Sequence, residues 1–420
     1  MNSKYRFTIL VAIALAILCG SCRKDADEIP NPDLGVLTGY LTYEGQFLAV
    51  WHGINSSYVH WSVDTVDWDA RYRRLLPKFR HLDSMLLDDN VADEDRCVPY
   101  EAFSALYTEL LQGLIDHHMT VYIKNLAPAP GDDQQVFAYM PGLEEVKSRD
   151  YYHGRVGIET GMKALRQMEQ AGQMSELRYE SSSDGFSIVS GLIEGKYAYL
   201  RMSGYELSSF VDEQDPTTPD GRLAEVYRHW MELCSRPSTQ GIILDNRGNT
   251  GGYATDLQYV VAPFIAEDIV PAYCRTKNGL HRLDYTPWAP MTIHKAAETR
   301  TDIPYLVLAD VWSVSMGEIT TAAIKSLPKG YFIGERTFGG HGPLSGNFSR
   351  TFAGTFGSMD DYHYVYTTTY QTKFVDGGIL EGYGIVPDTE VLLDLDDLSA
   401  NYRDNQLEAG LAYLRTTSNR

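Results

Sequence analysis

Two short apolar segments of this chain each run into a turn whose residues could act on an acyl group. Residues 241–245 lead into a glycine-rich turn at residues 246–252, and residues 305–309 lead into a serine-containing turn at residues 313–318. Apolar runs of this length are typical of buried strands. Glycine lets the backbone bend so that its N–H groups can face a developing negative charge. A serine hydroxyl near such N–H groups favours acyl-transfer chemistry.

Ser315 is the candidate nucleophile, because apolar residues at helical spacing follow it until Pro328 and Gly330 end the predicted helix. The free N–H groups and the dipole at a helix start favour negative charge there. Two alternatives stay open. Ser315 could be a plain N-cap, with Glu318 completing a capping box, and Ser313 is a competing hydroxyl.

A serine nucleophile needs a base, and two of the 11 histidines are candidates. His118 follows two leucines at helical spacing, which predicts that it points inward from the end of a helix. His341 lies in a glycine-rich loop and is closer in sequence to Ser315. A core histidine is also common as a structural residue. A third segment, residues 381–388, forms a glycine- and proline-containing turn that could present the Glu381 carboxylate or leave it solvated.

Helices and strands must position these residues, and their pattern along the sequence predicts an α/β protein with a helical N-terminal subdomain. Residues 37–125 show mostly helical apolar spacing, and residues 126–184 form a linker or inserted subdomain. Strands and helices alternate through residues 185–392, which argues for a core of βα units, and residues 393–420 close the chain with a helix. The expected elements are helices near 159–173, 222–235, 253–264, from 316 and over 396–414, strands at 241–245 and 305–309, a hairpin at 194–196 and antiparallel strands within 351–371.

Five segments, in this order, resemble the tail-specific (C-terminal-processing) serine protease family, most closely its tricorn-core and retinoid-binding-protein-like branch. They are Leu-Ile-Asp-His-His at 114–118, Asp-Asn-Arg-Gly-Asn-Thr-Gly-Gly at 245–252, Ser-Met-Gly-Glu at 315–318, Gly-Glu-Arg-Thr-Phe-Gly-Gly at 334–340 and Glu-Gly-Tyr-Gly-Ile-Val-Pro-Asp at 381–388. Each motif is weak alone, but five in order form a specific signal. The resemblance covers roughly residues 45–125 and 185–392. It implies a crotonase/ClpP-like core and peptide-bond hydrolysis.

The resemblance also implies a set of site residues. They are Ser315 as nucleophile, His118 as base, Glu381 as its distal acidic partner, and an oxyanion hole made by the N–H of Met316 with that of Gly251 or Gly252. Two departures from the family bear on the base. Gly340 occupies the position of the lysine base of the processing proteases, and His117 replaces the serine that precedes the histidine in tricorn-like members. Residues 126–184 show no PDZ pattern.

The N-terminus has the pattern of a targeting segment. Lys4 and Arg6 precede an apolar run at residues 7–19, and the sequence Cys-Gly-Ser-Cys at 19–22 resembles a bacterial lipobox. The resemblance implies a signal peptide at 1–21, lipidation of Cys22, a tether at 22–36 and an outer-membrane lipoprotein facing the periplasm or the cell surface. The alternative is ordinary secretion with a free Cys22. Removal of residues 1–21 takes Lys4 and Arg6 away, so the net charge changes from −20 to −22.

Charge and cysteine content narrow the functional class. A net charge of −20 without a basic stripe argues against a nucleic-acid partner. Cys97, Cys234 and Cys274 form neither a disulfide framework nor a zinc spacing, so we expect no metal and no cofactor. We therefore expect a serine peptidase acting on peptides or proteins, with two competing classes. One is a non-catalytic surface-binding lipoprotein on the same fold, and the other is a crotonase-like acyl-CoA enzyme.

Overall fold

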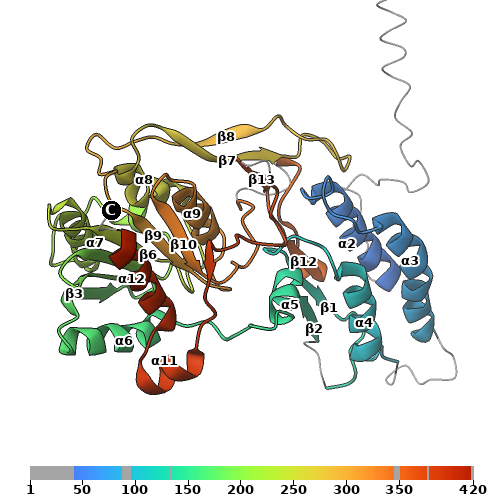
Figure 1. Ribbon diagram of the computed structural model, residues 1–420. Helices are drawn as coiled ribbons and strands as arrows, with labels where there is room; N and C mark the ends of the chain where they lie inside the picture. Colours follow the sequence, from blue (N-terminus) through green and yellow to red (C-terminus); the bar gives the residue numbers. More distant parts are fainter. Residues whose placement is uncertain (1–41, 88–95, 132–134, 345–350, 376–377, 418–420) are drawn as a thin grey trace, which may run out of the picture.

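The computed structural model describes residues 42–87, 96–131, 135–344, 351–375 and 378–417 (Figure 1). The expected signal peptide, the lipidation site Cys22 and the tether lie outside these residues. Within the described part of the chain, no helix combines the length and the apolar character needed to cross a membrane.

The N-terminal part is built from three helices on a small antiparallel sheet. The helices are α2 (Tyr43–Ser57), α3 (Trp68–Met85) and α4 (Tyr100–Leu111), and their inward faces form one aromatic-rich core. The sheet has the order β11 (Phe356–Ser358), β12 (His363–Tyr366), β1 (Thr120–Lys124) and β2 (Val136–Tyr139). Pairing of β1 with β12 brings a segment far along the chain next to the residues that follow α4. The fold therefore ties sequence-distant parts of the predicted site together.

The second part is a seven-stranded mixed sheet, seen in the left half of Figure 1. Its order is β14 (Thr389–Glu390), β10 (Gly330–Gly334), β9 (Tyr305–Ala309), β6 (Gly241–Asp245), β5 (Tyr197–Met202), β4 (Ser187–Ile193) and β3 (Met174–Ser181). The strands from β5 to β14 run parallel, whereas β3 and β4 pair antiparallel. All residues of β6 and β9 are buried, which explains their continuous apolar runs.

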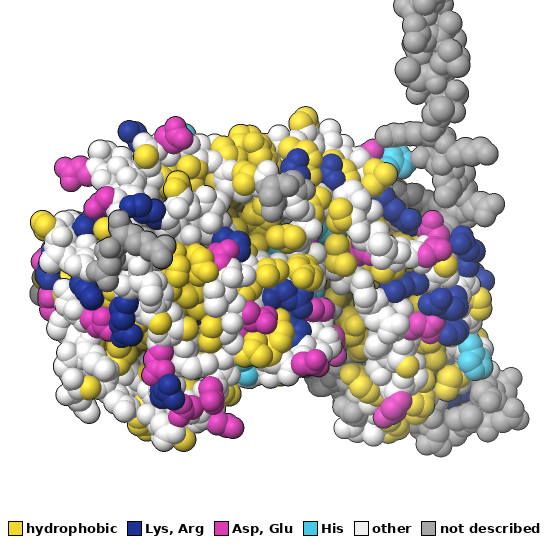
Figure 2. Space-filling view, in the orientation of Figure 1, with side chains coloured by type: hydrophobic (Ala, Val, Ile, Leu, Met, Phe, Trp, Pro, Cys, Tyr) yellow, Lys and Arg dark blue, Asp and Glu magenta, His cyan; other side chains and the backbone are white. Residues whose placement is uncertain are grey.

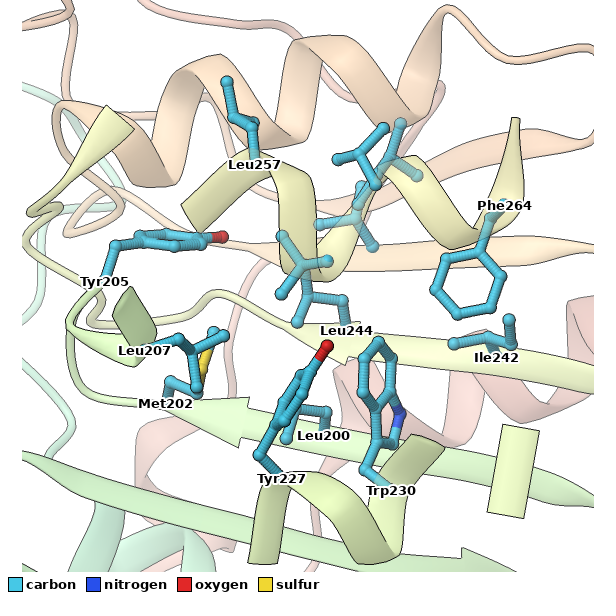
Figure 3. Packing of buried hydrophobic residues seen from close by; sticks show 14 of the residues in the cluster. Leu200, Met202, Tyr205, Leu207, Tyr227, Trp230, Ile242, Leu244, Leu257 and Phe264 are labelled. Atoms are coloured by element: carbon cyan, nitrogen blue, oxygen red, sulfur yellow. The ribbon is translucent and has the colours of Figure 1, made fainter. Parts of the chain in front are cut away.

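Helices cover both faces of this sheet. The helices α7 (Pro219–Ser235), α8 (Leu257–Val260) and α9 (Met316–Lys325) pack on one face, and α6 (Ile158–Gln170) and α12 (Asn405–Thr417) pack on the other. Figure 3 shows Tyr227 and Trp230 of α7 lying against Leu200 and Leu244 of the sheet. Because the sheet is buried from both sides, the turns that leave its strands have a rigid base.

A three-stranded sheet arches between the two parts (Figure 1). It consists of β13 (Tyr370–Phe374), β7 (Ile269–Thr276) and β8 (Ala289–Ile293). The loop between β7 and β8 reaches the N-terminal part, where the Tyr285 hydroxyl donates to the carbonyl of Val59, just after α2, at 2.9 Å. Figure 2 shows hydrophobic side chains gathered over the middle of this face, and Lys and Arg mixed with Asp and Glu rather than collected in one stripe.

The predicted α/β class with a helical N-terminal subdomain is confirmed. Strands 241–245 and 305–309, the helix from residue 316 and the hairpin at 194–196 are also confirmed. The helix predicted over 253–264 is wrong, because only Leu257–Val260 is α-helical and 3₁₀ turns flank it. Pro263 has no N–H to continue a helix. The single closing helix is also wrong, since α11 (Leu395–Asn401) ends at Tyr402, whose φ of 56° is left-handed.

Candidate active site

Ser315 lies in a strained turn between β9 and α9. Its φ is +57° and its ψ is −120°, a conformation that side-chain-bearing residues rarely adopt. Such strain costs about 1–3 kcal/mol and is concentrated at functional sites. The side chain is partly exposed, and the Ser315 N–H donates to the carbonyl of Gly340 at 2.8 Å. The backbone therefore holds this hydroxyl at the edge of the sheet rather than in the core.

The competing hydroxyl of Ser313 has a structural role. It is fully buried and donates to the carbonyl of Asn246 at 2.8 Å. The same oxygen accepts from the N–H of Asp310 at 3.0 Å. These bonds join the turn after β9 to the turn after β6, so Ser313 is part of the scaffold beneath Ser315.

The glycine-rich turn after β6 lies directly against Ser315. A methyl group on Gly251 would lie 3.0 Å from Ser315 Oγ and 2.9 Å from the Met316 nitrogen. The φ of Gly251 is +92°, so both the space and the backbone require glycine. Since β6 and β9 are neighbouring parallel strands, their carboxyl ends meet at one edge of the sheet. This topology brings the two turns together.

The three predicted oxyanion donors differ in their hydrogen bonding. The Met316 N–H and the exposed Gly252 N–H have no acceptor among the described residues, whereas the Gly251 N–H donates to Asn249 Oδ1 at 2.8 Å. Met316 and Gly252 thus offer free donors, and Gly251 offers the open space beside Ser315 Oγ.

A buried ion network holds the glycine-rich turn in place. Arg247 forms paired bonds with Asp404 at 2.7 and 2.8 Å and contacts Asp245 at 2.6 and 2.8 Å. Tyr199 donates to Asp245 at 2.7 Å. Burial alone would raise the pKa of Asp245, but Arg247 and Arg201 outweigh it and hold that pKa well below its ordinary value. The turn is thereby fastened to α12, which packs on the opposite face of the sheet.

His118 is not on a helix. The helix α4 ends at Leu111, and Gly113 follows with a φ of +79°, so the predicted helical continuation to residue 118 is wrong. His118 instead lies in the loop before β1, partly exposed. A methyl group on Gly340 would lie 3.3 Å from His118 Nδ1, and Gly340 also bonds Ser315. Gly340 therefore lies in space between His118, the predicted base, and Ser315, the predicted nucleophile.

The His118 ring is unpaired at one nitrogen. Its Nδ1 is buried and has no hydrogen-bond partner among the described residues. Among the described residues, no hydrogen bond joins Ser315 Oγ to an imidazole. Burial lowers the pKa of His118 below its ordinary value, and the nearby carboxylates of Asp116 and Glu318 only partly offset this effect. The imidazole is therefore neutral at pH 7, as a general base must be.

Glu381 lies in the same cluster but contacts backbone. It accepts from the N–H of His117 at 3.2 Å, of His341 at 3.1 Å and of Gly342 at 2.9 Å. The structure does not bring this carboxylate to the buried Nδ1 of His118, the contact that the sequence led us to expect of a distal acidic partner. Burial raises the pKa of Glu381 well above its ordinary value, with further increases from Asp116 and Glu318.

His341 is completely enclosed between two acidic side chains. Its Nδ1 lies 3.6 Å from Glu318 Oε1 and its Nε2 lies 4.0 Å from Glu381 Oε2. Its side chain has no exposed surface, whereas His118 is partly exposed. Glu318 also accepts from the N–H of Ser315 at 3.3 Å, which is its predicted capping contact.

Two residues with clear roles at the site were not assigned any from the sequence. Asp116 accepts from the N–H of His118 at 3.0 Å and from the hydroxyl of Thr367 and the N–H of Thr368, so it fixes the loop that carries the base. Asn246 donates to the carbonyl of Gly317 at 3.1 Å and supports the start of α9. Asp116 lies within the motif at 114–118, which could have identified it.

The lysines near Ser315 in sequence lie elsewhere. Lys325 pairs with Asp388 at 2.6 Å, and Lys329 donates to the carbonyl of Asp302. The position expected for a lysine base is Gly340. The site is therefore built around a serine hydroxyl, imidazoles, buried carboxylates and free backbone N–H groups, the components of a hydrolase that forms an oxyanion.

Comparison with known proteins defines that class further. Residues 196–391 match the family model described as Peptidase family S41. A search of curated proteins found no match. A solved structure of a candidate peptidase from Parabacteroides merdae is 19% identical, covers 89% of this chain and 96% of its own, and has a TM-score of 0.57. Mature CPAF in complex with lactacystin is 12% identical, with coverages of 90% and 97% and a TM-score of 0.49.

Proposed function

We propose that this chain is a serine peptidase that hydrolyses peptide bonds through an acyl-enzyme on Ser315. The observation that carries the proposal is the geometry at this residue. A partly exposed serine at φ +57° faces a glycine that leaves room beside its Oγ, and the free N–H groups of Met316 and Gly252 belong to the same two turns. The S41 domain match supports peptide-bond hydrolysis as the reaction class.

In this mechanism His118 is the general base. It takes the Ser315 proton as Oγ attacks the scissile carbonyl, and it later protonates the leaving amine. A base must face the substrate to return this proton, so the partly exposed His118 suits the role better than the fully enclosed His341. No hydrogen bond joins the two groups in the structure, and catalytic hydrogen bonds of this kind often tighten only when substrate binds.

The oxyanion is stabilised by backbone. The N–H groups of Met316 and Gly252 are the donors, and loss of one such donor typically costs ~2.7–4 kcal/mol of barrier. The N-terminus of α9 adds up to ~2 kcal/mol for negative charge at Ser315. These donors are fixed by the buried contacts beneath both turns, so little reorganisation accompanies the reaction.

Glu381 acts in this proposal as a positioning residue. Its carboxylate gathers the N–H groups of His117, His341 and Gly342. It thus aligns the loop that carries His118 with the loop that carries Gly340. This role replaces direct contact with the His118 ring, and it explains why a carboxylate is needed at that turn.

The test is active-site labelling. A fluorophosphonate probe should label the full chain at Ser315, as mapped by peptide mass spectrometry, and Ser315→Ala should abolish both labelling and turnover of a generic fluorogenic peptide library. His118→Ala should strongly reduce both labelling and turnover. The matched control His81→Ala, at an exposed histidine, should keep far more of each. Labelling that persists in Ser315→Ala would refute the proposal and favour the binding-protein alternative or, with acyl-CoA turnover, the crotonase-like one.

We further propose that the protein is a lipoprotein anchored through Cys22 in the cell envelope, acting on peptides or proteins there. The support is the lipobox-like sequence at 19–22 after a basic and apolar leader. An alkyne fatty acid fed to cells that express the chain should label wild type and not Cys22→Ser. Equal labelling of both would remove this proposal.

A further inference from the structure

Three buried carboxylates lie together behind His118. Asp116 and Glu318 are 0% exposed and Glu381 is 5% exposed. In the part of the chain that the structure describes, neither a lysine nor an arginine forms an ion pair with any of them. Taking carboxylates out of water without a countercharge is costly, so such groups are normally paired or bind metals.

Imidazole nitrogens lie in the same cluster. A ring nitrogen of His60 and carboxylate oxygens of Asp116 and Glu381 all lie within 4.8 Å of one another. His60 is completely buried, and its Nδ1 has no hydrogen-bond partner among the described residues. Both ring nitrogens of the enclosed His341 are likewise unpaired, and its Nε2 faces Glu381 Oε2 at 4.0 Å. Unpaired imidazole nitrogens beside carboxylates are the donor set of a transition-metal site.

We propose that His60, Asp116 and Glu381 bind a zinc-type divalent cation, with His341 as the fourth donor. Imidazole with carboxylate suits Zn²⁺, whereas Ca²⁺ and Mg²⁺ take oxygen ligands. This site has no sequence signature, because its ligands are far apart along the chain and have no metal-binding spacing.

Binding of a zinc ion requires the ligand atoms to move slightly closer together. With Zn–N and Zn–O distances near 2.0–2.1 Å, neighbouring ligand atoms of a tetrahedral site lie about 3.4 Å apart. The ligand atoms lie within 4.8 Å of one another, so each pair must approach by at most about 1.4 Å.

Hydrogen bonds that orient the ligands are already present. The hydroxyl of Thr368 contacts His60 Nε2 at 2.8 Å and Asp116 Oδ2 at 3.0 Å. The backbone N–H groups of His341 and Gly342 hold Glu381. Such outer contacts fix the orientation of metal ligands and change affinity 10–100-fold when they are lost.

The bound ion would join three segments of the fold. His60 follows α2, Asp116 precedes β1, and Glu381 lies in the turn that leads to β14. The cation would supply the countercharge that the buried carboxylates lack. This inference does not depend on the peptidase proposal, because metal binding is measured without substrate.

The experiment measures zinc binding by the full chain, purified without a polyhistidine tag and stripped with a chelator. Titration with Zn²⁺ followed by metal analysis should give one ion per chain. His60→Ala should bind at least about tenfold more weakly, and the control His81→Ala, an exposed histidine on α3, should bind as wild type does. A wild-type chain that takes up no zinc overturns the proposal, as does equal affinity in His60→Ala.

X-ray absorption at the zinc edge of the wild-type complex gives a second test that needs no variant to fold. The expected spectrum contains nitrogen and oxygen neighbours only. A sulfur neighbour would place the ion at a cysteine and would overturn the assignment. Fluorophosphonate labelling of Ser315 is read separately, so failure of either proposal leaves the other testable.

Discussion

The Gly251→Ala substitution tests the geometry of the site most directly. The added methyl group would lie 2.5 Å from Ser315 Cβ, 2.9 Å from the Met316 nitrogen and 3.0 Å from Ser315 Oγ. Carbon atoms in contact normally lie about 3.5–4.0 Å apart. Ser315 must therefore shift by roughly 1 Å, or the methyl group must occupy the space that the substrate carbonyl needs.

The expected effect on catalysis follows from that displacement. A misplacement of about 1 Å in an active site can cost about 10²-fold in rate, which corresponds to about 2.7 kcal/mol of barrier. We expect kcat/KM on a fluorogenic peptide, and the rate of fluorophosphonate labelling, to fall by at least this factor. Stability should also fall by about 1–2 kcal/mol, because alanine at φ +92° is strained.

Gly185→Ala is the matched control. Gly185 has the same φ of +92°, but a methyl group there meets nothing within 4 Å, and the residue lies in the β3–β4 turn. This variant should lose similar stability and keep wild-type activity. If folded Gly251→Ala retains kcat/KM within about threefold of Gly185→Ala, the oxyanion geometry inferred here is refuted.

Three further predictions concern titration and the base. Because burial lowers the pKa of His118, the acidic limb of kcat/KM should fall below pH 6.5, and a limb at or above that value would contradict His118 as base. His118→Ala should lower kcat by about 10²–10⁴-fold. His341→Phe keeps a ring in the same enclosed space and should leave a larger residual rate. The reverse order of residual rates would identify His341 as the base. Burial lowers the pKa of His52 to about 4. Between pH 6.5 and 4 the unfolded chain therefore binds a proton that the folded chain does not, and the free energy of unfolding falls as the pH drops. In urea unfolding, His52→Leu should remove about 2 kcal/mol of the loss in unfolding free energy between pH 7 and pH 5, and an unchanged loss would show that this histidine is not responsible.

Local sequence patterns were sufficient for the elements that carry the nucleophile. The buried runs at 241–245 and 305–309 and the helix from residue 316 are encoded by neighbouring residues. The position of Gly251 beside Ser315 then follows from parallel pairing of two strands that end at one edge. These features could be predicted because they depend on short-range periodicity and one common topology.

The surroundings of the base could not be predicted in the same way. Apolar spacing suggested that helix α4 continues to His118, but Gly113 ends the helix first. The carboxylate of Glu381 holds backbone N–H groups instead of the His118 ring. Backbone N–H groups have no sequence signature, so their choice of acceptor depends on where loops from distant segments meet.

The sequence by itself determined the strands, the serine turn, the glycine-rich turn and the acidic character of this protein, because each depends on residues adjacent in the chain. Tertiary structure alone decided which serine is exposed, which histidine is enclosed and which carboxylates share a cluster with His60. The pairing of β1 with β12 brings Asp116 to Thr367 and Thr368, which are far along the chain. Long-range pairing of this kind is set by the burial of whole sheets and helices, and no local pattern contains it.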